Sequence, residues 1–296
     1  MTHSKRSRSS YARRARPFAS RVLAATIAAT LVMAPHRADA QVTTSASGAN
    51  AAAIQAAVDA YRLSLGPLRA NVAGSFGSGR REINWDGVPD ALSAPNNLPA
   101  NFFNVNSPRG VVFSTPGSGF QVSGNAGTAP VRFDNINPLY SSTFSTFSAQ
   151  RLFTAIGSNI VDVNFFVPGT ATAALTRGFG AVFTDVDLTT STSLQFFDAA
   201  NTSLGTFSAA ALAGSGTLSF LGILFNAPIV SRVRITSGNT ALGASDQIGS
   251  SIDVVAMDDF IYGEPISSVV PEPGTYALVA SGLLALGVIT RRRRRA

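Results

Sequence analysis

Short apolar runs alternate with clusters of Gly, Asn, Ser and Pro over most of the chain. In residues 160–167 Val and Phe alternate with Asp and Asn, and in 232–235 Arg alternates with Val and Ile, which is the two-residue period of a strand with one wet face. The pattern predicts eleven strands, over 111–114, 120–123, 131–135, 151–155, 160–167, 178–186, 193–198, 204–208, 217–225, 230–236 and 252–262. Because no helical pattern lies between them, we expect an all-β domain with antiparallel sheets.

Some predicted strands, such as 218–225, are apolar on both faces, which is typical of central strands in a layered fold. We therefore expect a jelly-roll or lectin-like β-sandwich over residues 71–265. A β-helix is the alternative, but the sequence shows no fixed internal period to support it.

One helical pattern precedes the strands. Ile54, Val58, Tyr61 and Leu65 recur at spacings of four, three and four residues, and Asn50 can serve as the N-cap. Residues 43–49 are small and polar and are predicted to be a linker. Residues 41–70 are thus expected to form a linker followed by one short amphipathic helix.

The N-terminal 40 residues have the pattern of a secretory signal peptide. A basic segment precedes the apolar run 22–34, and Ala38-Asp39-Ala40 supplies small residues, so cleavage is expected after Ala40. Arg13-Arg14 leaves open a twin-arginine route, but the residues that follow favour the general secretion translocon.

The C-terminal segment 266–296 has three parts in a fixed order. Pro271-Glu272-Pro273 comes first, then an apolar run over 275–290, and finally a basic cluster of Arg291, Arg292, Arg293, Arg294 and Arg295. A helix of 16 residues spans about 24 Å, slightly less than the roughly 30 Å of a bilayer core. Arginines are retained on the cytoplasmic side, so the run is predicted to be a transmembrane helix with the body outside.

This three-part arrangement resembles the PEP-CTERM sorting signal of exported bacterial proteins. The resemblance implies recognition by an exosortase, with Pro271 to Pro273 and the five arginines as the sorting residues and cleavage near the Pro-Glu-Pro motif. It also implies passage through the inner membrane, a transient or permanent single-pass anchor, and a final location at the cell surface or in the extracellular matrix.

The basic charge of the whole chain comes from these two ends. Residues 41–270 hold ten Arg and Lys against fourteen Asp and Glu, a net charge of −4. We therefore expect no nucleic-acid partner.

The same span contains no His, Cys or Lys. This excludes histidine-activated nucleophiles, cysteine nucleophiles, Schiff-base lysines and the usual zinc ligand sets. We expect the protein not to be an enzyme. A glycoside hydrolase or lyase that uses paired carboxylates remains the alternative.

Carboxylates are the remaining candidate chemistry. Asp185 and Asp187 share one face of a predicted strand, whereas Asp258 and Asp259 should point to opposite faces of theirs. A buried carboxylate needs a partner, so these four residues are candidates for a structural Ca²⁺ site. The alternative is that they cap strands or pair with arginines, for which the candidates are Arg177, Arg232 and Arg234.

Trp85, the sole tryptophan, lies in the sequence Asn-Trp-Asp-Gly. An exposed ring beside polar residues suits stacking on a sugar, so Trp85 is a candidate ligand-binding residue. The alternative is that it packs in the core.

Residues 178–188 and 254–262 loosely resemble the bodies of other PEP-CTERM proteins. This implies a lectin-like or carbohydrate-binding sandwich and supplies no catalytic residue. We expect a surface or matrix protein associated with exopolysaccharide and biofilm. A structural envelope protein without a specific ligand is a further alternative.

Overall fold

The computed structural model describes residues 41–124, 131–148, 150–246, 251–267, 279–284, 286 and 291. Its strands are β1 Gln41–Gly48, β2 Arg80–Ile83, β3 Val111–Ser114, β4 Gly119–Val122, β5 Phe153–Ile156, β6 Ile160–Phe165, β7 Ala174–Leu175, β8 Gly178–Thr184, β9 Ser193–Phe197, β10 Ser203–Ser208, β11 Leu218–Phe225, β12 Arg232–Thr236, β13 Ala256–Gly263 and β14 Ile266–Ser267. Its helices are α1 Ala51–Leu65, the 3₁₀ turn η1 Asp90–Leu92, α2 Phe102–Val105 and α3 Tyr140–Thr143.

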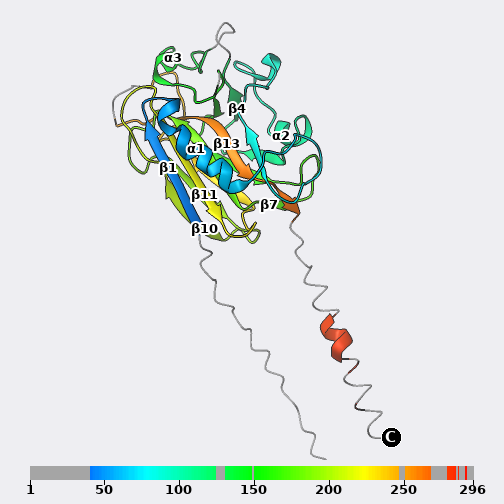
Figure 1. Ribbon diagram of the computed structural model, residues 1–296. Coiled ribbons are helices and arrows are strands. Elements are labelled where there is room, and N and C mark those ends of the chain that lie inside the picture. The colour runs from blue at the N-terminus through cyan, green and yellow to red at the C-terminus, as the bar shows by residue number, and fades with distance from the viewer. Residues whose placement is uncertain are drawn as a thin grey trace, which may run out of the picture. The chain divides into compact units, whose positions relative to one another are not determined.

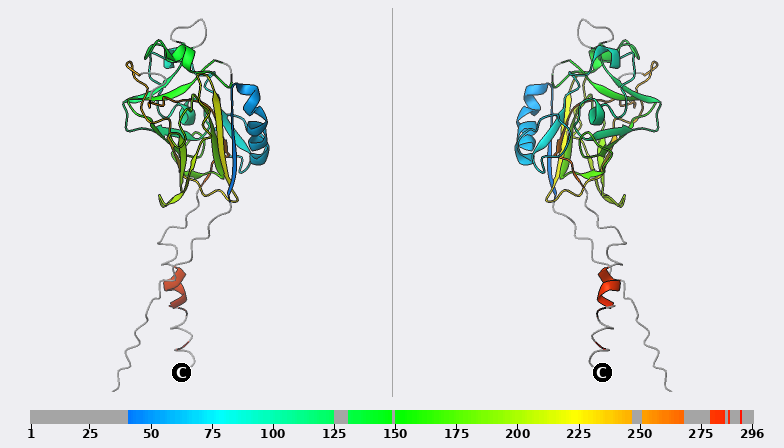
Figure 2. Two further views of the ribbon diagram at one scale, coloured as in Figure 1. Left: turned by 90° about the vertical axis from the view of Figure 1, so that its left-hand side faces the viewer. Right: turned by 90° about the vertical axis from the view of Figure 1, so that its right-hand side faces the viewer.

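The strands form two main antiparallel sheets. The larger has the order β1-β11-β8-β13-β5-β4, with β2 also paired to β13, and the smaller has the order β10-β9-β12-β6-β3. A short two-stranded sheet joins β14 to β7. Figures 1 and 2 show the sheets as two layers, with α1 on the outer side of the larger one. The expectation of an all-β, antiparallel domain is confirmed.

The main core lies between the two sheets. Val161, Val163 and Phe165 of β6 face it from the smaller sheet, and Phe179, Phe183 and Phe260 face it from β8 and β13 of the larger one. The intervening residues of β6 are half-buried, as alternation predicts. β11 and β13 are buried on both faces because the outer face of their sheet is covered as well.

Helix α1 provides that cover. Asn50 accepts a hydrogen bond from the backbone N–H of Ala53 at 3.2 Å, and Gly66 ends the helix with a φ of 99°. The buried residues Ile54, Val58, Tyr61 and Leu65 pack against Val182, Phe220 and Ile261 of the sheet. The predicted helix, N-cap and C-terminal stop are therefore confirmed.

Tyr61 fits closely over the sheet because two strands carry glycine beneath it. A Cβ at Gly222 would lie 2.7 Å from the tyrosine Cδ2, and one at Gly180 would lie 2.9 Å from Cε1. The Tyr61 hydroxyl donates a hydrogen bond to the carbonyl of Ile223 at 3.0 Å, so its polar end is paired although the ring is buried.

Three predictions of local structure are wrong. The predicted linker is strand β1, which pairs with β11 from Gln41 opposite Phe225 to Gly48 opposite Leu218. Strand β2 is missing from the predicted set because its sequence, Arg-Arg-Glu-Ile, is mostly charged. The predicted strand 131–135 is a turn, in which Arg132 and Phe133 have positive φ.

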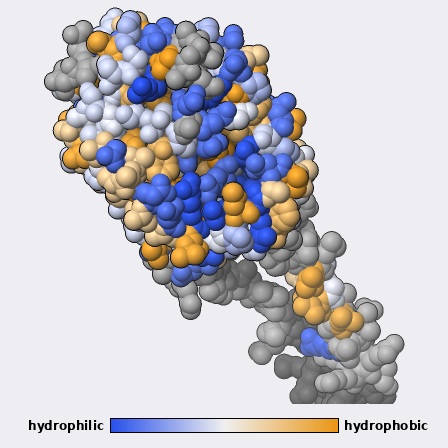
Figure 3. Space-filling model, turned by 45° about the horizontal axis from the view of Figure 1, so that its top comes forward, coloured by the Kyte–Doolittle hydropathy of each residue, from blue (hydrophilic) through white to orange (hydrophobic). Residues whose placement is uncertain are grey.

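The predicted signal peptide lies outside the described residues, as do the Pro-Glu-Pro motif and most of the predicted membrane span and arginine cluster. Residues 279–284 are helical. Among the described residues, none of the helices has the length and apolar character needed to cross a membrane. On the face of the domain shown in Figure 3, polar residues cover much of the surface and apolar residues form small groups between them.

Candidate functional site

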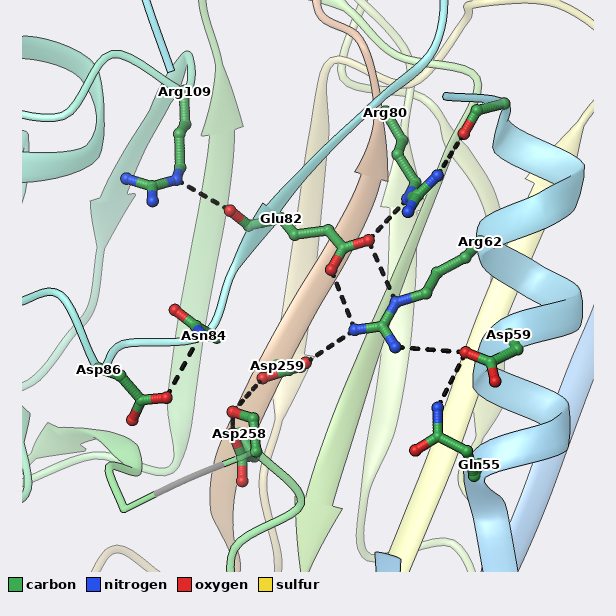
Figure 4. Close-up of polar contacts among 12 residues, drawn as sticks. Gln55, Asp59, Arg62, Arg80, Glu82, Asn84, Asp86, Arg109, Asp258 and Asp259 are labelled. Carbon is green, nitrogen blue, oxygen red and sulfur yellow. Dashed lines mark hydrogen bonds and ion pairs between the residues drawn. The ribbon is translucent and has the colours of Figure 1, made fainter. Parts of the chain in front are cut away.

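A polar cavity of about 290 Å³ lies beside the C-terminal half of α1 (Figure 4). It is bordered by side chains from α1, β2, β13 and the loops around them. The polar lining consists of Arg62, Asn71, Glu82, Asn84, Arg109, Ser148 and Asp259. Residues from five separate parts of the chain therefore meet at one surface.

Arg62, in the last turn of α1, is the centre of this network. Its Nε and Nη2 donate to the two carboxylate oxygens of Glu82 at 3.1 and 3.0 Å, and Nη2 also reaches Asp259 at 3.1 Å. Burial opposes the charge on Arg62, but Glu82 and Asp259 outweigh it and raise the pKa of the guanidinium. The helix is thus joined to two strands by charged hydrogen bonds.

Arg109 brings a second cation to the cavity. Its Nε donates to the backbone carbonyl of Glu82 at 2.8 Å, and the guanidinium lies 5.1 Å from the centre of the Phe103 ring. Burial lowers the pKa of Arg109. Within the described part of the chain no carboxylate forms an ion pair with it. Nη1 also donates to the Ser107 hydroxyl, so the described partners of the Arg109 guanidinium are all uncharged.

Asp258 and Asp259 lie at a β-bulge, which corrects the prediction that they point to opposite faces. Met257 pairs with Phe183 and Phe260 pairs with Ala181, so two residues of β13 oppose one of β8. Both carboxylates consequently accept from the Ser148 hydroxyl, at 3.2 and 2.7 Å. Strict alternation fails here because the bulge inserts an extra residue.

The two aspartates also share a hydrogen bond, which requires a proton on one of them (Figure 4). Burial raises the pKa of both carboxyls, and for Asp258 the charge of Asp259 adds to the effect. Asp258 is fully buried and also accepts from the backbone N–H of Phe147 at 2.6 Å. The pair therefore holds a proton to a higher pH than two free aspartates would.

The structure does not bring the four predicted calcium ligands together. Thr184 pairs with Ala256 at the end of β8, so Asp185 and Asp187 lie beyond this ladder and away from the bulge. Asp253 lies beside them instead: its charge helps to raise the pKa of Asp185, and it accepts from the backbone N–H of Asp187 at 3.1 Å. In the part of the chain that the structure describes, no group of three or more His, Cys, Asp or Glu side chains is arranged to hold a metal ion.

The arginines proposed as alternative partners mostly bind elsewhere. Arg232 and Arg234 both pair with Asp162 across the smaller sheet, at 2.9 and 2.8 Å. Asp259 instead pairs with Arg62, whose position on the helix gave no signal of this contact.

Trp85 is a core residue and not an exposed platform. Its side chain is 1% exposed, and its ring stacks on Phe153 with the ring centres 4.1 Å apart. The indole N–H donates to the backbone carbonyl of Asp258 at 2.9 Å. The core alternative is therefore correct, and Trp85 acts on the site by fixing the backbone of the bulge.

Taken together, these features define an antiparallel β-sandwich protein with a mixed-charge surface cavity beside its covering helix. Residues 269–295 match the family model of the PEP-CTERM protein-sorting motif. The predicted resemblance of the C-terminal segment to this motif is confirmed, and the motif indicates an exported protein that is targeted to an exosortase. It also indicates association with the cell envelope or surface. No curated protein and no solved structure matches the chain.

Proposed function

We propose that this chain is a non-enzymatic protein of the bacterial surface or extracellular matrix that binds an acidic polysaccharide and contributes to biofilm. The sorting motif supports delivery to the envelope. The observation that carries the ligand assignment is the cavity in which Arg109, free of any carboxylate partner among the described residues, stands beside amide and hydroxyl side chains.

The composition of the cavity fits one acidic sugar unit. Asn71, Asn84 and Ser148 offer donors and acceptors for hydroxyl groups, and Arg109 offers a cation for a carboxylate. Leu68, with 55% of its surface exposed, adds an apolar contact at the edge. The volume lies near the lower end of the roughly 300–1,000 Å³ range of small-molecule sites, which suits a single residue of a longer polymer.

The alternative of a glycoside hydrolase or lyase has weaker support. Two catalytic carboxyls must flank the scissile bond on opposite sides. In this cavity Glu82 and Asp259 both bind Nη2 of Arg62, so both are already ion-paired to one guanidinium. This arrangement favours binding over hydrolysis.

We also propose a jelly-roll topology for the sandwich. Of the larger sheet, the strands β5-β13-β8-β11 are neighbours, and of the smaller one β6-β12-β9-β10. In chain order these eight strands change sheet at every step except from β9 to β10, which pair within the smaller sheet. This is the order expected for two interlocked Greek keys. β3 and β4 then extend the two sheets at one edge, and β1 extends the larger at the other.

The proposal also assigns roles to the N-terminal signal peptide and the C-terminal sorting segment. The signal peptide directs the chain to the translocon, and cleavage after Ala40 leaves β1 intact because this strand begins at Gln41. The apolar run 275–290 holds the chain in the inner membrane until the exosortase acts. The body is then released to the surface or the matrix.

The test is titration of the exported protein with the bacterium's own exopolysaccharide, in parallel with a neutral polysaccharide and with an assay for released sugars. We expect binding of the acidic polymer without sugar release. Asn71→Asp adds a negative charge beside the cavity and should weaken binding by about 1 kcal/mol, or about fivefold. Asn96→Asp is the matched control, because Asn96 is also exposed and is not part of the cavity.

Other outcomes separate the alternatives. Release of sugars that stops on substitution of Glu82 or Asp259 would establish a hydrolase or lyase. Neither binding nor release would favour a structural envelope protein without a specific ligand. Equal weakening by both Asn→Asp variants would place the polysaccharide site elsewhere on the body.

A further inference from the structure

A second cavity, of about 310 Å³, lies where α1 ends and β8 begins. Its walls are partly apolar, from Leu65, Pro67, Pro228 and Ile266. Its polar lining includes Ser78, Asn226 and Arg177. Leu65 belongs to helix α1, and the other lining residues lie in loops or at the ends of strands.

Arg177 has no partner for its guanidinium within the described body. Its Nε is buried and makes no hydrogen bond to any described residue, and no carboxylate forms an ion pair with it there. Each of the other arginines in the described parts of 41–267 donates at least one side-chain hydrogen bond. The two Nη groups of Arg177 are not among the buried unpaired atoms, so they leave four N–H donors to offer to a ligand.

The one acidic side chain in the wall does not supply the missing partner. Glu264 is fully buried, and its Oε2 accepts from Arg81 Nε at 2.6 Å. Its Oε1 accepts from Arg81 Nη2 at 2.9 Å and from the backbone N–H of Phe76 at 3.2 Å. Because Arg81 neutralises Glu264, the positive charge of Arg177 is left uncompensated in the cavity.

We propose that this cavity is a binding site for a carboxylate attached to an apolar body. The planar guanidinium of Arg177 matches the two oxygens of a carboxylate, and the Leu65, Pro67, Pro228 and Ile266 walls receive the apolar part. The site is independent of the cavity beside Arg62 and does not rest on the function proposed for it.

The carboxylate can come from either of two sources. One is a free ligand outside the chain. The other is Glu272, which stands between two prolines six residues after Ile266, within about 20 Å of extended chain. Both sources present the same chemistry, a carboxylate with apolar neighbours, so the experiment must tell them apart.

The experiment measures the binding of butyrate to the purified full-length chain by saturation-transfer NMR. Butyramide serves as the uncharged comparison. We expect butyrate to bind at least about tenfold more tightly than butyramide, because a charge-assisted contact to arginine is lost in the amide. Arg177→Gln should remove this preference. Arg234→Gln, which deletes an arginine on the smaller sheet, should leave it unchanged.

A second variant covers the case in which Arg177→Gln fails to fold. Asn226 is exposed, and Asn226→Asp places a carboxylate of nearly the same shape at the edge of the cavity. This variant should pair with Arg177 and weaken butyrate binding by a similar factor. If wild type fails to bind butyrate but Glu272→Gln binds it, the chain's own tail is the source.

Two results would overturn the proposal. One is that neither wild type nor Glu272→Gln prefers butyrate to butyramide. The other is that folded Arg177→Gln or Asn226→Asp keeps the full preference of the wild type.

Discussion

Asp185→Asn should make the protein more stable at pH 8 and not at pH 5. Asp185 follows β8 directly, is 2% exposed, and has an Oδ1 without a hydrogen-bond partner in the described structure. Burial, with help from the charges of Asp187 and Asp253, raises the pKa of this carboxyl to about 7. The backbone suits the change, because Asp185 has a φ of 70° and Asn tolerates this region well.

The sign follows from proton linkage. A carboxyl whose pKa is higher in the folded state stabilises the fold while it is protonated in that state, and this contribution is lost as pH rises. Here the loss runs from about pH 4 to about pH 7. Between pH 5 and pH 8 a folded-state pKa near 7 corresponds to a loss of about 2.7 kcal/mol in the free energy of unfolding of the wild type. Relaxation of the surroundings should reduce this loss to about 1–2 kcal/mol.

Urea unfolding of wild type and variant at the two pH values measures this difference. The free energy of unfolding of Asp185→Asn, relative to wild type, should rise by about 1–2 kcal/mol from pH 5 to pH 8. Asp59→Asn is the control, since the Asp59 side chain is 57% exposed. A difference between Asp185→Asn and wild type that stays constant across this pH range would refute the reasoning.

Two further predictions concern the buried ion pair and the tail. Glu264→Gln leaves Arg81 buried without its carboxylate, so it should lower the free energy of unfolding by about 3–5 kcal/mol. Urea titration measures this loss, and a value below about 1 kcal/mol would contradict the prediction. Protein recovered from the cell surface should lack the peptide that contains Arg291 to Arg295 when it is examined by mass spectrometry, since the sorting motif predicts cleavage before this cluster. An intact C-terminus on all surface protein would instead make the tail a permanent anchor.

The sequence predicted those elements whose pattern is set by the core. Helix α1 follows from the spacing of its four buried residues, and strands such as β6 follow from strict alternation. Strand β1 was not predicted, because it is an edge strand of small polar residues and most of its side chains are exposed or half-buried. Its pairing with β11 depends on backbone hydrogen bonds, which leave no apolar pattern.

The candidate site was less predictable, because its contacts join residues far apart in sequence. The polar face of α1 gives no sign that Arg62 reaches Asp259, 197 positions later. The bulge at Asp258 depends on how β13 registers against β8, which a period of two cannot reveal. A polar turn sequence suggested an exposed Trp85, but tertiary packing against Phe153 buries it.

Strand β1 also constrains when the domain can fold. It is the first of the described strands in the chain, yet its partner β11 ends at Phe225. Contacts this distant in sequence form slowly, because a long loop must close before any pairing is gained. The larger sheet cannot be completed until the chain as far as Phe225 is available for pairing. The domain therefore gains its full cooperativity late, after most of the body has been made.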